Sequence, residues 1–121
     1  MKTLPNEVTI FNATPHAIRF WRKDWDELVE VESDCVLSAK ASEEVVDIHN
    51  GVTFVKTYFM PQKDEAYQKA FNAFKSGAIV VGSIIAAQAY PDIVVAMTPA
   101  PGYERVPPSE KRMNPDKFTV F

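Results

Sequence analysis

Apolar and polar residues alternate in short runs through the first part of the chain, which is typical of β-strands. Val8–Phe11 and Ile18–Trp21 are the first two such runs, and the polar break Asn12–Pro15 separates them. Pro15 fixes its own φ and favours an extended conformation at Thr14, so we expect this break to be rigid. The pattern predicts a hairpin or a strand–turn–strand unit with the polar cluster at its bend.

Weaker and stronger strand signals follow towards residue 60. Val29–Val36 alternates loosely and predicts a less regular strand, whereas the small and polar residues of Leu37–Glu44 predict a loop. Val45–Ile48 and Val52–Phe59 then flank the dipeptide Asn50-Gly51. Asn-Gly between two β-rich runs is a strong signal for a tight hairpin.

The pattern changes to a helical period after Met60-Pro61. Tyr67, Ala70, Phe71 and Phe74 recur at i, i+3, i+4 and i+7, which predicts an amphipathic helix over residues 64–76 with this stripe against the core. Asp64 suits the N-cap of this helix, and Gly77 suits the left-handed position that follows a helix.

Continuous apolar runs in the last third of the chain predict buried strands at Ala78–Val81 and Ile93–Met97. Between them, either the first strand runs on through Gly82-Ser83, or Ser83 caps a short helix over about 83–90 that Pro91 ends. The remaining segments predict a loop at Thr98–Gly102, a short extended piece at Tyr103–Val106, a surface excursion at Pro107–Pro115 and a last strand at Phe118–Phe121.

These elements together predict an α+β fold with a mostly antiparallel sheet, one main amphipathic helix and a second short helix. The 121 residues, 46% of them hydrophobic, suffice for one compact domain over residues 1–121 that folds without a metal or disulfide. The chain has a single cysteine, Cys35, so no intrachain disulfide forms. We interpret Cys35 as a small hydrophobic residue rather than a nucleophile.

Charge and hydropathy narrow the classes of partner. The chain has 13 basic and 16 acidic side chains and a formal net charge of -3, so it offers no surplus of cations for extended DNA or RNA. One or two well-placed Arg or Lys side chains suffice for a small anionic ligand. No signal-peptide-like stretch begins the chain, and the longest apolar run, residues 78–90, is too short to span a bilayer. We expect a cytoplasmic protein without a membrane partner.

No catalytic signature is present. The sequence lacks a phosphate-cradling glycine motif and a G-x-S-x-G nucleophile motif. A zinc site built from Cys and His needs three or four ligands, and the chain has only His16, Cys35 and His49 of those types. We therefore expect no metal, no cofactor and no catalysis.

Two polar segments stiffened by prolines contain the best candidate binding residues. In the first, Asn12, Thr14 and His16 either shape the turn or donate hydrogen bonds to a ligand. In the second, Thr98–Arg105, the Arg105 guanidinium suits a phosphate and the Tyr103 ring suits stacking on a base. The alternative for this second segment is a surface loop held by a salt bridge.

Two single residues are weaker candidates. Ser83 would lie in an anion-binding helix N-terminus if a helix begins there. Lys56 projects from a predicted strand and is either a partner for an anion or a solvated side chain.

Four sequence blocks support a family resemblance. The first is Asn-x-Thr-Pro-His-x-Ile, formed by Asn12, Thr14, Pro15, His16 and Ile18; the others are Val55-Lys56-Thr57, Ile79–Ala89, and Asp92–Val95 continued through Pro101 to Arg105. With these blocks the chain resembles a family of small, mostly uncharacterised phage and prophage proteins. The predicted helix at 64–76 and the segment Pro107–Pro115 look like insertions relative to the shortest members.

The resemblance implies a phage accessory protein. By analogy of class it suggests a sponge, which sequesters the nucleotide signals of anti-phage defence. Our first hypothesis is therefore a non-catalytic, homo-oligomeric protein that binds a cyclic nucleotide or an ADP-ribose type of ligand where the His16 turn meets the Thr98–Arg105 loop. The alternative is a protein–protein interaction module that exposes Trp21, Trp25 and Phe121. A hydrolase with His16 as general base ranks last because no nucleophile or metal is evident.

Overall fold

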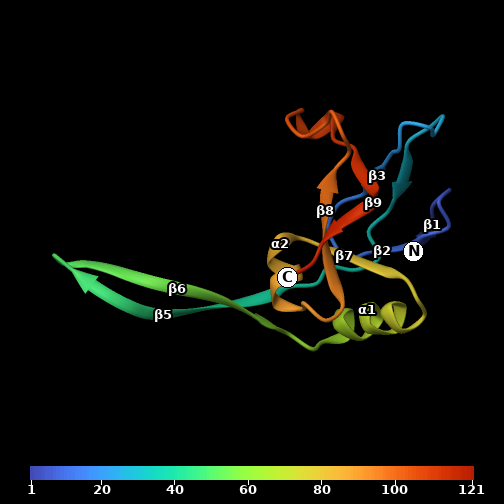
Figure 1. Cartoon of the computed structure of the whole chain (residues 1–121). Coiled ribbons are helices and arrows are strands. Elements are labelled where there is room, and N and C mark those ends of the chain that lie inside the picture. The colour runs from blue at the N-terminus through green and yellow to red at the C-terminus, as the bar shows by residue number, and fades with distance from the viewer.

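A mixed seven-stranded sheet forms the body of the protein, in a computed structural model that describes residues 1–121 (Figure 1). The strand order is β1-β2-β7-β8-β9-β3-β4. The strands are β1 (Lys2–Thr3), β2 (Thr9–Asn12), β3 (Ile18–Phe20), β4 (Val29–Val31), β7 (Ile79–Gly82), β8 (Val94–Pro99) and β9 (Met113–Thr119). The helices are α1 (Glu65–Lys75), α2 (Ile84–Ala89) and the 3-10 turn η1 (Pro108–Glu110). The expected α+β class is confirmed.

Antiparallel pairings outnumber parallel ones only narrowly. β1–β2, β3–β4, β8–β9 and the separate pair β5–β6 are antiparallel, whereas β2–β7, β7–β8 and β3–β9 are parallel. The parallel centre explains why Ile79–Val81 and Val94–Ala96 are continuously apolar, since both faces of these strands are covered.

Of the two arrangements predicted for the first two strand segments, the hairpin is wrong and the strand–turn–strand unit is confirmed. β2 and β3 lie four strands apart in the sheet, although only residues 13–17 join them. Four strand spacings are about 19 Å, which is close to the greatest reach of such a short linker. The sheet therefore curls, and its two edges approach each other on the side of the β2–β3 connection.

Hydrogen bonds join the two approaching edges. The Lys2 ammonium of β1 donates to the Glu30 carbonyl of β4 at 2.9 Å. The Asn12 side chain at the end of β2 donates to the Val31 carbonyl at 2.9 Å, and the Asn12 carbonyl accepts from the Asp34 amide at 2.8 Å. Asp34 in turn accepts from the Asn12 amide and pairs with the amino group of Met1.

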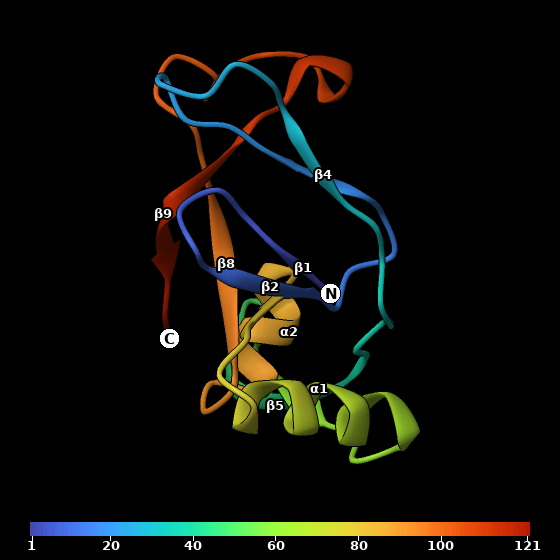
Figure 2. The same cartoon turned by 90° about the vertical axis from the view of Figure 1, so that its right-hand side faces the viewer.

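The two faces of the curled sheet bury separate apolar clusters. One cluster lies under the helices and contains Phe11, Val80, Val94 and the alanines of α1 and α2. The other lies inside the curl and is centred on Ile10, Phe20, Val31 and Val81, with members from both edges of the sheet. Figure 2 shows α1 and α2 together at the lower end of the body.

Both predicted helices and their caps are confirmed, but Phe74 of the predicted core stripe is exposed, and Ala70 and Ala73 are the buried residues of α1. α1 has Asp64 as N-cap, with its carboxylate accepting from the Tyr67 amide at 3.0 Å, and Gly77 has the expected positive φ of 97°. α2 exists with Ser83 as its N-cap, so the alternative of a strand running through Gly82-Ser83 is excluded. Neither helix is long and apolar enough to cross a membrane.

A long two-stranded arm leaves the body beside α2 (Figure 1). It consists of β5 (Ala39–His49) and β6 (Val52–Pro61), joined at the predicted turn, where both Asn50 and Gly51 have positive φ. The prediction of a loop over residues 37–44 is wrong from Ala39 onward. Every residue from Lys40 to Tyr58 is exposed, so this segment has no buried face to give it a strand-like pattern.

The C-terminal third departs from the sequence prediction in two ways. Tyr103–Val106 forms turns rather than an extended piece, and the final strand begins already at Met113. Pro115 fits inside β9 because the β8–β9 register breaks between Pro99↔Met113 and Met97↔Phe118, so no ladder bond requires its missing N–H.

Candidate functional site

The Asn12–Ile18 segment is built around the Asn12 side chain, which is fully buried. Its amide nitrogen donates to the carbonyls of His16 at 2.7 Å and Val31 at 2.9 Å. Its amide oxygen accepts from the Thr14 amide at 2.9 Å and from the Thr14 hydroxyl at 2.7 Å. All of its hydrogen-bonding capacity is used inside the protein, so Asn12 shapes the turn rather than contacting a ligand.

Thr14 also belongs mainly to the turn. Its side chain is buried, and its hydroxyl lies 2.9 Å from the His16 carbonyl. Its carbonyl accepts from the Ser33 hydroxyl at 2.5 Å. These bonds hold the backbone on either side of Pro15, so the residue that follows, His16, is presented in a fixed position.

His16 lies at the mouth of a cavity of about 600 Å³, which we name the His16 cavity. The imidazole is exposed, and only its backbone groups take part in the hydrogen bonds of the turn. The cavity is lined by Thr14, Pro15, His16, Ala17, Ile18, Arg19, Ser83, Met97, Pro108, Lys111 and Met113. Three elements far apart in sequence thus meet here: the turn before β3, the start of α2, and η1 with the start of β9.

The His16 cavity combines an apolar floor with basic groups. Ile18, Met97 and Met113 supply the apolar part, and Arg19 and Lys111 supply two cationic side chains. No Asp or Glu lines the cavity. Arg19 donates hydrogen bonds to the carbonyls of Pro108 and Ser109 at 3.2 and 2.8 Å, and neither Arg19 nor Lys111 forms an ion pair. Glu110 lines an adjacent cavity together with both cations. Two cations over an apolar floor favour an anion with an apolar part.

Ser83 lines the cavity as predicted, but its hydroxyl is already engaged. It accepts from the Ala86 amide at 3.1 Å and caps α2. α2 has only six residues, so its dipole is small and adds little to the attraction of the Arg19 and Lys111 side chains. The predicted anion site at a helix N-terminus is therefore a minor part of this cavity.

The Thr98–Arg105 loop does not line the His16 cavity. Tyr103 lines a neighbouring cavity of about 440 Å³, which shares Arg19 and Lys111 with the first. The Tyr103 ring packs edge-on to Trp21, and the Arg112 guanidinium lies over both rings at 4.7 and 4.9 Å. Tyr103 is thus part of an aromatic–cation cluster beside the site rather than a free stacking platform.

Three other predicted residues lie away from the His16 cavity. Thr98 donates to the Lys117 carbonyl at 2.7 Å and stabilises the irregular β8–β9 pairing. Arg105 lies in an exposed turn and lines none of the cavities. Lys56 lies on the arm with its ammonium over the Tyr58 ring at 5.4 Å, remote from the cavity because the arm runs away from the body (Figure 1).

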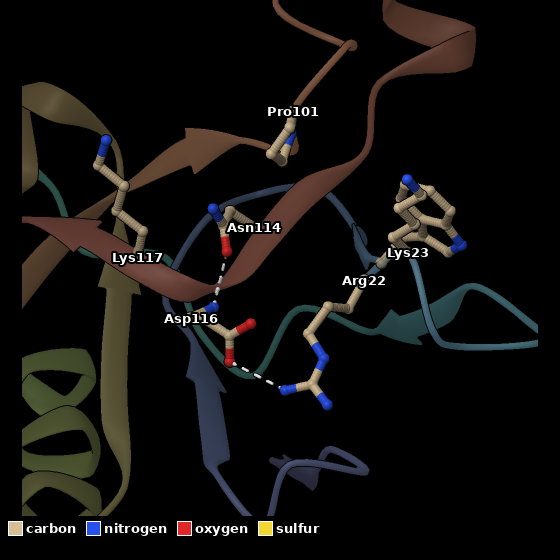
Figure 3. Close-up of a pocket in the computed structure, with 7 residues that line it drawn as sticks. Arg22, Lys23, Pro101, Asn114, Asp116 and Lys117 are labelled. Atoms are coloured by element: carbon tan, nitrogen blue, oxygen red, sulfur yellow. Dashed lines mark hydrogen bonds and ion pairs between the residues drawn. The ribbon is translucent and has the colours of Figure 1, made fainter.

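A third cavity, of about 550 Å³, lies on β9 around Asp116 (Figure 3). Arg22 donates to Asp24 at 2.6 Å and approaches Asp116 at 3.5 Å, and Lys23 and Lys117 lie on opposite sides of this group. The hydrogen bond to Asp24 raises the pKa of Arg22 and lowers the pKa of Asp24, so both remain charged. Because Arg22 is already paired with Asp24 and Asp116, this cavity suits an anion less well than the His16 cavity.

The remaining reactive groups are the Cys35 thiol and the metal-ligating types of side chain. Burial raises the pKa of the Cys35 thiol, which lies near the Ala66 carbonyl and keeps its proton. His, Cys, Asp and Glu side chains form no group of three or more that could hold a metal ion.

Sequence reasoning missed Arg19 and Lys111, the two cations of the His16 cavity. Arg19 carried a usable signal, because it alternates with the buried Ile18 and Phe20 and must face away from them. Lys111 carried none, since it lies 92 positions from Arg19 and only the parallel pairing of β3 with β9 brings the two together.

The comparisons with known proteins found no match: no family model, no curated protein and no solved structure is similar to this chain. The resemblance to phage and prophage proteins therefore stays a prediction from its sequence blocks.

Proposed function

We propose that the protein binds and sequesters a small phosphate-containing nucleotide in the His16 cavity without changing it chemically. The observation that supports this proposal is that two cationic side chains, Arg19 and Lys111, line one cavity and that no carboxylate lines it. Two phosphates or a pyrophosphate would lie between the two cations, because Arg offers a planar fork of donors and Lys a point charge.

The rest of the cavity suits the nucleoside part of such a ligand. Its volume of about 600 Å³ lies within the range of about 300–1,000 Å³ usual for small-molecule sites. Met97 and Met113 provide a soft apolar floor for a base or ribose, and the exposed His16 ring offers a face for stacking or a hydrogen bond.

The absence of a built nucleophile, metal group or activated thiol around the cavity favours binding over catalysis as the role of this site. Together with the Asn-x-Thr-Pro-His-x-Ile block, this supports the narrower proposal of a phage accessory protein that sequesters a nucleotide immune signal. Cyclic nucleotides and ADP-ribose derivatives are the ligand classes to test first.

Isothermal titration calorimetry of the pure protein with cyclic dinucleotides and ADP-ribose derivatives tests the proposal. We expect heat from one or more of these compounds, and the compound recovered after denaturing the protein should be chemically unchanged by chromatography and mass spectrometry. Flat traces with every member of the panel would end the proposal, and recovery of a cleaved product would replace binding with catalysis.

Matched lysine variants locate the site. Lys111→Gln should weaken binding by about ten- to a hundredfold, because a hydrogen bond to a charged group contributes about 1.5–3 kcal/mol. Lys117→Gln is the control, since this lysine lines the Asp116 cavity instead. Equal effects of the two substitutions would show that binding reports net charge rather than the His16 cavity.

The two tryptophans do not support the alternative of a protein–protein interaction module. Trp21 packs against Tyr103 and Arg112, and Trp25 lies under Arg22 and against the inner apolar cluster. Only Phe121 of the three predicted residues is exposed. Half of the exposed large apolar side chains lie on the arm instead.

A further inference from the structure

The β5–β6 arm lacks any support from the body over most of its length. All residues from Lys40 to Tyr58 are exposed, and the element that contacts the arm most is α2, at its base. A two-stranded hairpin alone in water is only marginally stable, and three or more strands or a packed face are needed for independent stability. The arm therefore requires a surface that covers it.

The two faces of the arm differ in character. Directly paired residues share a face, so Val45 with Val55 and Ile48 with Thr53 lie on one side, together with the pair Ala41 and Phe59. We name this side the valine face. Its valines and Ile48 have exposed fractions between 43% and 66%, and Glu43 is its only charged residue.

The opposite face mixes charges with apolar side chains. This face exposes the large apolar side chains of Val52, Phe54, Tyr58 and Met60, and the charged side chains of Lys40, Glu44, Asp47 and Lys56 lie among them. The whole arm contains three acidic residues and two lysines, so it carries no strong charge of one sign. That balance favours neither nucleic acid nor an anionic lipid surface as the occupant.

The area of the arm points to a reciprocal contact. Ten residues of β6 span about 34 Å and the ribbon is about 10 Å wide, so one face covers about 340 Å². This is less than half of the roughly 800 Å² per partner that a specific complex buries. If two copies exchange arms, each contributes one arm and one receiving surface, and the area doubles to about 680 Å² per copy.

We propose that the valine face of the arm packs on a second copy of this chain and that two copies exchange arms around a two-fold axis. A foreign partner would receive one arm and gain only half of this area. A second copy also removes two exposed apolar faces with one contact, whereas a free monomer leaves both in water.

The body offers a receiving surface of the same apolar character. Outside the arm, two pairs of adjacent large apolar side chains are exposed, Ile84-Ile85 at the start of α2 and Val120-Phe121 after β9. Gly82 and Thr119, which lie two residues and one residue before these pairs, both pair with Ala96 and so lie about 10 Å apart across β8. Because β7 and β9 run antiparallel, the chain leaves this row in opposite directions towards the two apolar pairs. The receiving surface we infer comprises these two pairs.

Light scattering coupled to size-exclusion chromatography, over a range of micromolar concentrations, tests the proposal. We expect twice the chain mass of 13.6 kDa. A protein that stays monomeric to the highest soluble concentration would overturn the proposal and leave the arm to a different partner. The measurement needs no nucleotide, so its failure is distinct from failure of the proposed function.

Paired substitutions on the two faces test which side docks. Val45→Lys with Val55→Glu preserves a favourable cross-strand pair but puts two charges on the valine face, and it should shift the dimer to monomer. Glu44→Lys with Lys56→Glu exchanges charges on the opposite face and should leave the dimer intact. The reverse result would refute the assignment of the faces.

A shortened arm serves as a second variant in case the charged valine face unfolds the hairpin. Replacing residues 43–57 by Asn-Gly joins the paired Ser42 and Tyr58 through a tight turn and removes only exposed residues. This variant should give an unchanged circular dichroism melting temperature for its body and the mass of a monomer. A dimer that survives the shortening would overturn the proposal.

Discussion

Removal of the Asn12 side chain tests the idea that this residue fastens the two edges of the curled sheet. Asn12→Ala deletes four hydrogen bonds of 2.7–2.9 Å and leaves the buried Val31 carbonyl and the Thr14 amide without their partner. A net contribution of about 1 kcal/mol per bond, with a further cost for buried groups left unpaired, gives a loss of about 3–5 kcal/mol.

Such a loss is a large part of the total stability of a small domain, which is about 5–15 kcal/mol. For a chain of this length the unfolding entropy is about 0.25 kcal/mol/K, so Tm should fall by about 12–20 °C. Urea unfolding followed by the fluorescence of Trp21 and Trp25 measures the change directly, because both rings pack within the body.

Two companion variants make the test of Asn12 specific. Asn12→Asp keeps the shape but turns a lone pair towards the carbonyls of His16 and Val31, so it should destabilise at least as strongly as Asn12→Ala. Asn72→Ala removes an exposed amide on α1 and should cost less than about 0.5 kcal/mol. A loss below about 1 kcal/mol for Asn12→Ala would refute the reasoning.

Three further predictions concern the core, the base of the arm and the thiol. Gly82→Ala should lower the free energy of unfolding by about 1–3 kcal/mol, because the new Cβ would lie 2.7 Å from Val94 Cγ1 and 3.0 Å from Ala86 Cβ. An unchanged midpoint of urea unfolding would contradict this packing. Tyr90→Phe removes a hydroxyl that accepts from the Gln62 amide and donates to the Ser38 carbonyl, each at 2.7 Å. The free energy of unfolding should fall by about 1–2 kcal/mol, and the Gln62 amide hydrogen should exchange faster with solvent. An unchanged exchange rate of this amide would argue against the contact. Burial raises the pKa of the Cys35 thiol above its unfolded value, so the stability of the protein should fall as pH rises above about 8.5, where the unfolded thiol loses its proton first. Iodoacetamide should therefore react more slowly with the native thiol than with the urea-unfolded one, and equal rates would contradict the burial.

Local signals predicted local structure well. The Asn50-Gly51 turn, the Asp64 cap and the Ser83 cap are each set by residues within a few positions of one another, so their chemistry is legible in the sequence. The wrong hairpin prediction has a different cause. Alternation identifies a strand but not its partner, so the separation of β2 from β3 depends on contacts made much later in the chain.

The site was only partly predictable for the same reason. His16, Thr14 and Ser83 meet at one cavity, which the sequence anticipated in part. The cations came from elsewhere, because the expected Arg105 lies in an exposed turn while Arg19 and Lys111 approach through the β3–β9 pairing. The prolines indicated a stiff loop but not where the loop lies in the fold. Tyr103 of the Thr98–Arg105 loop packs against Trp21 rather than at the His16 turn.

The Tyr90 hydroxyl has a mechanical consequence. It contacts Ser38 and Gln62, the residues just before β5 and just after β6, so one oxygen atom secures both ends of the arm. Tyr90 also ends α2, whose first residue follows Ser83 in the wall of the His16 cavity. With a lever of about 34 Å, a tilt of about 10° at this pivot moves the arm tip by about 6 Å. A helix of six residues thus joins the wall of the His16 cavity to the base of the arm.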